Sequence, residues 1–254
     1  MKQFNLAGRA AVVTGGNTGI GFGIAEGLAE AGAALAIVGR KAAKSAEAVK
    51  KLEARGVRAI AIEADVAREA DCTRLIAEAA KALGRIDILV NNAGIAIRKP
   101  PQDYSAAEWR QIIDVNLSSA FYCAHAIYPH LCRAGGGKII NIGSMMSIFG
   151  APFAVAYGAS KGGIVQMTKG LATAWAKDNI QANAILPGWI DTDLTRGARE
   201  QVPGLNERVL ARTPAGRWGA PADFAGPAVF LASSASDFVN GAVLTVDGGY
   251  SVQG

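Results

Sequence analysis

The chain has 254 residues, of which 50% are hydrophobic and 19% are charged, and its formal net charge is +5. This composition excludes intrinsic disorder, and the length suits one α/β domain whose core needs neither disulfides nor a structural metal. Lys and Arg are scattered among Asp and Glu without a run of five like charges, so no patch for nucleic acid or a membrane surface is indicated.

The few cysteines and the N-terminal segment indicate a reducing compartment. Cys72, Cys123 and Cys132 show no C-x-x-C spacing and do not form an extracellular disulfide framework. Residues 1–9 lack the apolar core of a signal peptide, and no apolar run approaches the ~18 residues that span a bilayer. We therefore expect a cytoplasmic protein that makes no membrane contact.

Short apolar runs with β-branched residues alternate with stretches of helical periodicity, such as 42–55 and 68–83. This alternation predicts a parallel sheet of about seven strands with helices on both faces, in a single domain over residues 1–254. Strands buried on both sides have continuous apolar runs, as these do. The predicted strands are 10–14, 33–38, 57–62, 86–90, 138–142, 180–185 and 242–246.

Two later segments differ from this alternation. An apolar stripe through Ile164, Met167, Leu171 and Trp175 predicts a long helix over 161–177 that begins before Tyr157. Residues 190–213 are interrupted by Asp, Thr, Arg, Gly and Pro, which predicts a long irregular loop. Such loops often cover binding sites, so we expect a substrate lid there.

The first predicted strand ends in a glycine-rich loop that a helical pattern follows. Gly15, Gly19 and Gly21 let the backbone turn sharply and approach a pyrophosphate, with Asn17, Thr18 and Ile20 between them. The following helix offers unpaired N–H groups and the positive end of its dipole. The position between a strand and a helix makes this loop a predicted dinucleotide site of the Rossmann type, with its doubly wound sheet.

The spacing G-x-x-x-G-x-G resembles that of the short-chain dehydrogenase/reductase family, and the resemblance extends over essentially the whole chain. It implies that Asp65 and Val66 hold the adenine ring, that the Asn-Asn-Ala-Gly run of residues 91–94 steadies the sheet and lines the cofactor cleft, and that Thr192 meets the nicotinamide carboxamide. Each motif follows a predicted strand, and ligands of open α/β sheets bind at those carboxyl ends. The further cofactor residues so implied are Asn92, Ala93, Gly94, Tyr157, Lys161, Pro187, Gly188 and Ile190.

Ser144, Tyr157 and Lys161 form the candidate catalytic group. Tyr157 and Lys161 lie one helical turn apart on a shared face. A phenol with a pKa near 10 is a poor base, and we expect the Lys161 ammonium and an oxidised nicotinamide to lower the pKa of Tyr157 toward the working pH. Tyr157 would then exchange a proton with an alcohol or ketone whose oxygen Ser144 holds. The resemblance adds Asn116, which would hold a water that links Lys161 to solvent.

A competing motif is excluded by its context. Gly158, Ser160 and Gly162 fit G-x-S-x-G, the nucleophile elbow of α/β-hydrolases, which needs a turn between a strand and a helix and a later histidine. Here the serine lies inside a predicted helix, and His125 and His130 both precede it. No cluster of His, Cys and Asp has zinc spacing, so we predict no metal.

The substrate pocket is expected between residues 95–104, 145–153 and 189–213. Apolar candidates for its wall are Met145, Met146, Ile148, Phe149, Phe153 and Trp189, and Arg98, Arg196 and Arg199 are candidates to meet an acid. Residues 214–219 and 237–241 resemble the branch of the family that acts on sugars, sugar acids and polyols. Reduction of 3-oxoacyl thioesters, a broad carbonyl reductase and a non-catalytic NADP-binding regulator remain as alternatives, since fold-level analogy cannot choose among them.

The end of the second strand indicates the cofactor. An Asp or Glu about 20 residues beyond the glycine loop would bind the ribose 2′-hydroxyl of NAD and repel a 2′-phosphate. Gly39 stands at that position, and Arg40 can clamp a phosphate with two hydrogen bonds. We predict a preference for NADP(H), and an Asp at position 39 should favour NAD. Dual use of NAD(H) stays open because Thr18 stands where many NADP-dependent relatives carry a second basic residue.

The resemblance also implies a homotetramer. The apolar C-terminal stretch 242–252 would bury well between subunits. Closed symmetric assemblies are the rule for soluble oligomers.

Overall fold

The structure, a computed structural model, describes residues 2–254 and contains one parallel sheet. Its seven strands lie in the order β3-β2-β1-β4-β5-β6-β7. Every predicted strand is confirmed within two residues of its predicted bounds. The strands are β1 Ala10–Thr14, β2 Ala34–Gly39, β3 Ala59–Glu63, β4 Ile88–Asn91, β5 Gly137–Ile142, β6 Ile180–Pro187 and β7 Val243–Val246.

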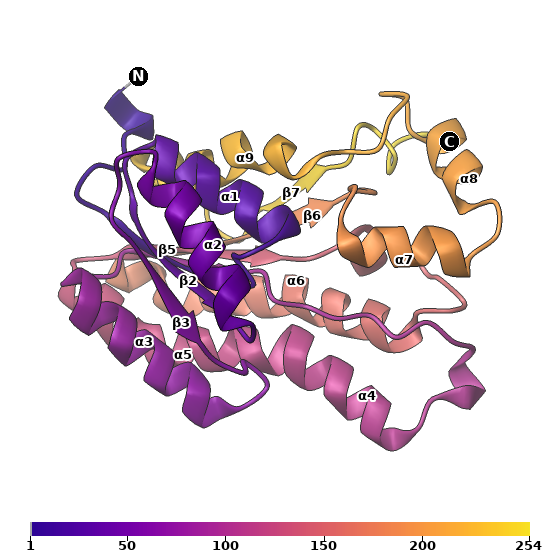
Figure 1. Cartoon of the computed structure of the whole chain (residues 1–254), viewed down its shortest axis with the longest axis horizontal. Helices are drawn as coiled ribbons and strands as arrows, with labels where there is room; N and C mark the ends of the chain where they lie inside the picture. The colour runs from indigo at the N-terminus through magenta and orange to yellow at the C-terminus, as the bar shows by residue number, and fades with distance from the viewer. Residues whose placement is uncertain (1) are drawn as a thin grey trace.

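Helices cover both faces of the sheet, as the alternating pattern predicted (Figure 1). One layer contains α1 (Gly19–Glu30), α2 (Ala42–Glu53) and α9 (Ala225–Ala232). The other contains α3 (Glu69–Leu83), α4 (Ala106–Ile113), α5 (Ser119–Arg133) and α6 (Val155–Trp175). The fold is therefore the doubly wound Rossmann type.

Strand residues alternate between two apolar cores because successive side chains point to opposite faces. Val13 packs with Ile24 of α1 in one core, and its neighbour Val12 packs with Leu75 of α3 in the other. All five residues of β1 are buried. This two-sided burial explains why the sequence of the strand is continuously apolar and why the strands were readable from it.

The strand order reverses between β1 and β4, which places a crevice at their carboxyl ends. The register pairs Thr14 with Asn91 at that edge. The Thr14 hydroxyl accepts hydrogen bonds from the backbone N–H groups of Asn92 at 3.0 Å and Ala93 at 3.2 Å. The glycine loop after β1 and the segment after β4 are therefore fixed to one another.

Residues 190–213 are not an irregular loop, and that prediction was wrong. They form α7 (Asp193–Gln201) and α8 (Leu205–Arg212), which extend beyond the carboxyl edge of the sheet (Figure 1). The two helices are only nine and eight residues long and mostly polar, and Pro203 and Gly204 lie between them, so the segment resembled a loop in the sequence. Ala198, Leu205 and Val209 form a small core of their own, and Trp189, Val202 and Trp218 pack against it.

Candidate active site

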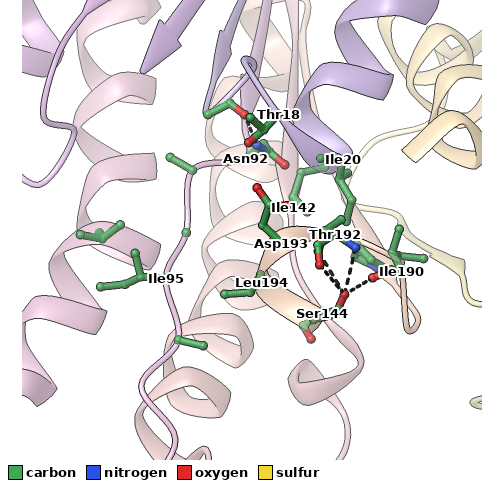
Figure 2. A pocket seen from close by; sticks show the side chains of 18 of the residues that line it. Thr18, Ile20, Asn92, Ile95, Ile142, Ser144, Ile190, Thr192, Asp193 and Leu194 are labelled. Carbon is green, nitrogen blue, oxygen red and sulfur yellow. Dashed lines mark hydrogen bonds between the residues drawn. The ribbon is translucent and has the colours of Figure 1, made fainter. Parts of the chain in front are cut away.

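A cleft of about 700 Å³ opens at the carboxyl ends of the central strands, between the glycine loop, the segment after β4, α6 and α7. Figure 2 shows side chains from these segments around it, among them Thr18, Asn92, Ser144 and Thr192. Of the predicted catalytic and cofactor-binding residues, only Gly21 and Asn116 lie outside its wall. Those that line it are Gly15, Asn17, Thr18, Gly19, Ile20, Arg40, Asp65, Val66, Asn92, Ala93, Gly94, Ser144, Tyr157, Lys161, Pro187, Gly188, Ile190 and Thr192.

The glycine loop has the conformation that its residues require. Gly15 and Gly19 have φ values of +62° and +55°, which favour glycine. A Cβ on Gly21 would lie 2.3 Å from the Gly15 carbonyl oxygen, so Gly21 lets α1 pack against the loop. Thr18 begins α1 without a side-chain capping bond, and the first turn holds no acidic residue. The N–H groups of that turn thus suit a pyrophosphate.

The side chains of Asn91 and Asn92 hold neighbouring strands together by hydrogen bonds. The Asn92 amide donates hydrogen bonds to the carbonyl oxygens of Thr14 at 3.0 Å and Gly15 at 3.1 Å. Asn91, which is buried, donates to Asn141 on β5 at 2.9 Å. Both contacts agree with the sheet-steadying role that the resemblance implied for this run.

Three cations lie together where the ribose of a dinucleotide would reach the end of β2. Arg40, Lys41 and Lys44 line the cleft, and none has an acidic partner within 4 Å among residues 2–254. Sequence reasoning missed Lys44, although it lies four residues after Arg40, one turn along the adjoining helix. An unpaired cationic cluster suits a phosphate.

Lys161 is buried beneath the catalytic tyrosine candidate. Only 4% of the residue is exposed, and its ammonium donates a 2.6 Å hydrogen bond to the Ile142 carbonyl oxygen. It lies 5.8 Å from the centroid of the Tyr157 ring. Burial lowers the pKa of Lys161 to about 8.

The pKa of Tyr157 depends on burial and on the groups around the ring. Burial raises it above its ordinary value, and the groups that oppose this rise are the Ser144 hydroxyl and the charge of Arg98. The Lys161 ammonium lies 5.8 Å from the centroid of the same ring. Arg98, which the sequence analysis considered only for the substrate, is therefore a second cation near the phenol.

Ser144 is held in place by hydrogen bonds at its side chain and at its backbone. Its Oγ accepts a hydrogen bond from the Met146 N–H at 3.1 Å, and its own N–H donates to the Ser147 hydroxyl at 3.2 Å. Ser147 in turn donates to the Lys161 carbonyl oxygen at 2.7 Å. Ser147, which the sequence analysis did not single out, therefore links the strand that carries Ser144 to the helix that carries Tyr157.

Asn116 lies in a short π-helical segment, Asp114–Ser118, behind the cleft. Its amide donates to the Ile95 carbonyl oxygen at 3.0 Å and to the Ser160 hydroxyl at 3.1 Å, and its oxygen accepts from the Ile95 N–H at 2.8 Å. Both amide hydrogens are thus committed to protein atoms. The side chain holds the segment after β4, and its amide N–H groups are not free to bind the expected water.

The substrate end of the cleft contains some of the expected residues and not others. Met145, Met146, Phe153, Trp189, Arg98 and Arg196 line it, whereas Ile148, Phe149 and Arg199 do not. Arg199 pairs with Asp191 and stacks on the Trp218 ring, and Arg196 pairs with Asp191 and Asp193.

Arg98 differs from these two arginines. Its donors contact the Leu194 carbonyl oxygen at 3.2 Å and Gln201 at 3.4 Å, and no carboxylate among residues 2–254 lies within 4 Å of it. Burial lowers its pKa, while the nearby Tyr157 opposes that change. Arg98 is therefore a half-buried cation of the cleft, close to the tyrosine, with no acidic partner among residues 2–254.

Residues 2–254 contain neither a candidate metal site nor a helix suited to crossing a membrane. No group of three His, Cys, Asp or Glu side chains there is placed to hold a metal ion. None of the helices in the same part of the chain has the length and apolarity needed to cross a membrane.

The fold and the site define an oxidoreductase that uses a nicotinamide dinucleotide. A sequence profile described as enoyl-(acyl carrier protein) reductase matches residues 15–251. The 2-dehydro-3-deoxy-D-gluconate 5-dehydrogenase of Dickeya dadantii is 43% identical over 251 residues, 98% of each chain. Gluconate 5-dehydrogenase of Gluconobacter oxydans is 39% identical, over 98% of this chain and 97% of that one.

A solved structure agrees with these relatives. Gluconate 5-dehydrogenase from Burkholderia cenocepacia, crystallised with NADP and tartrate, has a TM-score of 0.93 at 43% identity and covers 98% of each chain. The chain belongs to the short-chain dehydrogenase/reductase family. It is an NAD(P)-dependent oxidoreductase that acts on CH–OH groups, as the sequence predicted.

Proposed function

We propose that this enzyme interconverts a secondary alcohol and a ketone on a sugar acid and prefers NADP(H) to NAD(H). The observation that carries the substrate class is Arg98, a half-buried guanidinium in the cleft with no acidic partner among the described residues. A buried cation without an anion is costly, and a substrate carboxylate offsets that cost. The names of the relatives, which act on gluconate and its derivatives, support the same class.

In the proposed reaction the residues of the chain move a proton, and a nicotinamide in the cleft would supply or accept the hydride. The Tyr157 hydroxyl donates its proton to a ketone oxygen or accepts one from an alcohol. The Ser144 hydroxyl, oriented by the Met146 N–H, would donate to the same oxygen as negative charge develops on it. Lys161 would hold the nicotinamide ribose, and Asn116 positions the wall of the cleft through Ile95.

The preference for NADP(H) rests on the charges around the end of β2. Arg40, Lys41 and Lys44 supply three cations that have no acidic partner within the described part of the chain, and Gly39 supplies no carboxylate. A 2′-phosphate would be bound by these groups, whereas a 2′-hydroxyl would gain little from them. The structure from Burkholderia cenocepacia, crystallised with NADP, supports this assignment.

The substrate class is tested with matched ketones that differ in a carboxylate. We expect kcat/KM to be at least tenfold higher for a keto-aldonic acid than for a neutral ketose of the same length. Arg98→Met should lower kcat/KM for the acid by about 50-fold and leave the neutral ketose within about threefold, since a charged hydrogen bond is lost.

Arg196→Met is the matched control, because this exposed arginine lines the cleft but is paired with Asp191 and Asp193. Arg196→Met should change kcat/KM for either substrate by no more than about threefold, because exposed ion pairs contribute little. A wild-type enzyme that reduces the neutral ketose as well as the acid would contradict the proposal.

A second candidate is reduction of acyl thioesters. The matching family profile carries that description, and Met145, Met146 and Phe153 give the cleft an apolar side. Oxidation of NADPH with a 3-oxoacyl thioester, measured beside the sugar acids, separates the two. A protein that binds NADPH but turns over neither class would be the non-catalytic regulator.

We further propose that the enzyme is a cytoplasmic homotetramer. Phe238 is fully exposed, Val252 is 83% exposed, and the neighbouring β7 pairs with only one other strand among residues 2–254. Phe121, half exposed, stacks on His125 of α5. Exposed apolar groups at two separate places suit two different subunit contacts.

A further inference from the structure

Asn17 of the glycine loop is bonded to the first turn of α2. Its amide nitrogen donates a 3.0 Å hydrogen bond to the hydroxyl oxygen of Ser45. Ser45 is only 1% exposed, and its N–H bonds the Lys41 carbonyl oxygen at the start of the helix. The pair therefore joins the phosphate-binding loop to the segment that carries the three cations.

This pair fills the space next to Gly39. A Cβ on Gly39 would lie 2.4 Å from the Asn17 amide nitrogen and 3.1 Å from both the Asn17 Cγ and the Ser45 hydroxyl. A contact of 2.4 Å is too short, so any side chain at position 39 must displace Asn17. Displacement breaks the bond to a buried hydroxyl, which makes it costly.

The position next to this pair is where a Rossmann enzyme selects its cofactor. An acidic residue at the end of the second strand binds the ribose hydroxyls of NAD and repels the phosphate of NADP. Gly39 ends β2 and pairs with Glu63 in the register with β3. The backbone of Gly39 is not in the left-handed region, so conformation alone does not explain the glycine here.

We propose that Asn17, fixed by Ser45, is a specificity-determining residue. It occupies the space that an acidic side chain at position 39 would need, and so maintains the preference for NADP(H). This inference rests on the proposed cofactor preference. It adds a condition to the sequence expectation for Asp at position 39: the exchange to NAD requires the loss of Asn17 as well.

The test is a double-mutant cycle read by calorimetric binding of NADPH and NADH to the purified enzyme, with no substrate present. Gly39→Ala introduces bulk without charge and should weaken both cofactors by about tenfold, because the buried hydrogen bond is lost. In the Asn17→Ala background the same Gly39→Ala change should raise the Kd of either cofactor by less than about threefold. Gly39→Asp should weaken both cofactors when alone. Combined with Asn17→Ala it should tighten NADH by at least about tenfold relative to Gly39→Asp alone.

The outcomes are distinguishable. If Gly39→Asp alone tightens NADH as much as it does in the Asn17→Ala background, Asn17 has no such role. A wild-type enzyme that binds NADH more tightly overturns the proposed cofactor preference, while the cycle still measures the coupling. If Gly39→Asp alone fails to fold, as judged by its Tm, the double variant Ser45→Ala with Gly39→Asp replaces it. The Ser45→Ala change releases Asn17 from its partner, so this double variant must show the same gain for NADH over NADPH.

Discussion

The guanidinium of Arg98 donates a 3.2 Å hydrogen bond to the Leu194 carbonyl oxygen, which ties the segment after β4 to α7 across the mouth of the cleft. Thr192, at the start of α7, faces the glycine loop, and its methyl group would lie 3.3 Å from a Cβ on Gly19. The small core of α7 and α8 is separate from the two main cores. Because their core is separate from the two main cores, we expect α7 and α8 to open as a unit.

We predict that residues 193–212 exchange their amide hydrogens faster than β4 and β5 in the free enzyme, and that saturating NADP⁺ slows this exchange by at least about tenfold. The reason is that a unit with few buried contacts opens locally, whereas a ligand that touches it stabilises the closed form. Hydrogen exchange with mass spectrometry measures both rates. Protection that is already equal to that of the sheet before cofactor is added would argue against a lid.

Tyr157→Phe is expected to lower kcat by about 10²–10⁴-fold, the usual contribution of a positioned proton donor. The ring stays in its place between α6 and the cleft, so the Kd for NADPH should change by less than about threefold. The measurement is single-turnover reduction of the best keto acid, together with cofactor binding. If the variant keeps a tenth of the wild-type rate, another group donates the proton.

The sequence predicted the sheet and the cofactor loop well because both depend on local signals. The apolar runs of β1, β4 and β6 are buried on two sides, and the glycines of the loop need φ values or close approaches that few other residues tolerate. Tyr157 and Lys161 were found because one helical turn links them. These signals lie within a few residues of each other.

Features that depend on contacts between distant segments could not be predicted in the same way. Arg98 was one of three equivalent arginines in the sequence, and only the ion pairs of Arg196 and Arg199 with α7 neighbours distinguish it. The contact between Asn17 and Ser45 joins residues 28 positions apart. The pKa of Tyr157 likewise depends on how deeply the ring is buried, which no spacing reveals.

The proposed tetramer makes Phe238→Asp informative. The side chain is fully exposed, so the substitution should leave the fold of a single chain intact, while a charge inside a subunit contact is costly. Light scattering after gel filtration at micromolar concentration should show four chains of 26.1 kDa for the wild type and a smaller assembly for the variant. A wild-type monomer would contradict the tetramer, and a tetrameric variant would exclude Phe238 from its contacts.

The buried ammonium of Lys161 makes stability depend on pH in a calculable direction. Its pKa falls from an ordinary value of 10.5 to about 8 in the folded chain. Between these two values the unfolded chain binds more protons than the folded one, so this group makes stability rise with pH across that window. Below pH 8 both states are protonated and the full cost of burial, about 3 kcal/mol, is present.

Lys161→Met removes the titrating group, so the difference between wild type and variant isolates its contribution to the pH dependence of stability. The lost hydrogen bond to the Ile142 carbonyl adds a cost that does not vary with pH, so the informative quantity is how the difference in unfolding free energy changes. We expect the variant to lose about 3 kcal/mol relative to the wild type as the pH rises from 7 to 10.5, because only the wild type gains stability there. Urea unfolding of the cofactor-free proteins at several pH values measures this difference.

Lys169→Met, at an exposed position two turns further along α6, should show no such change. A constant difference between the Lys161→Met variant and the wild type would mean that the Lys161 ammonium keeps its ordinary pKa in the folded enzyme.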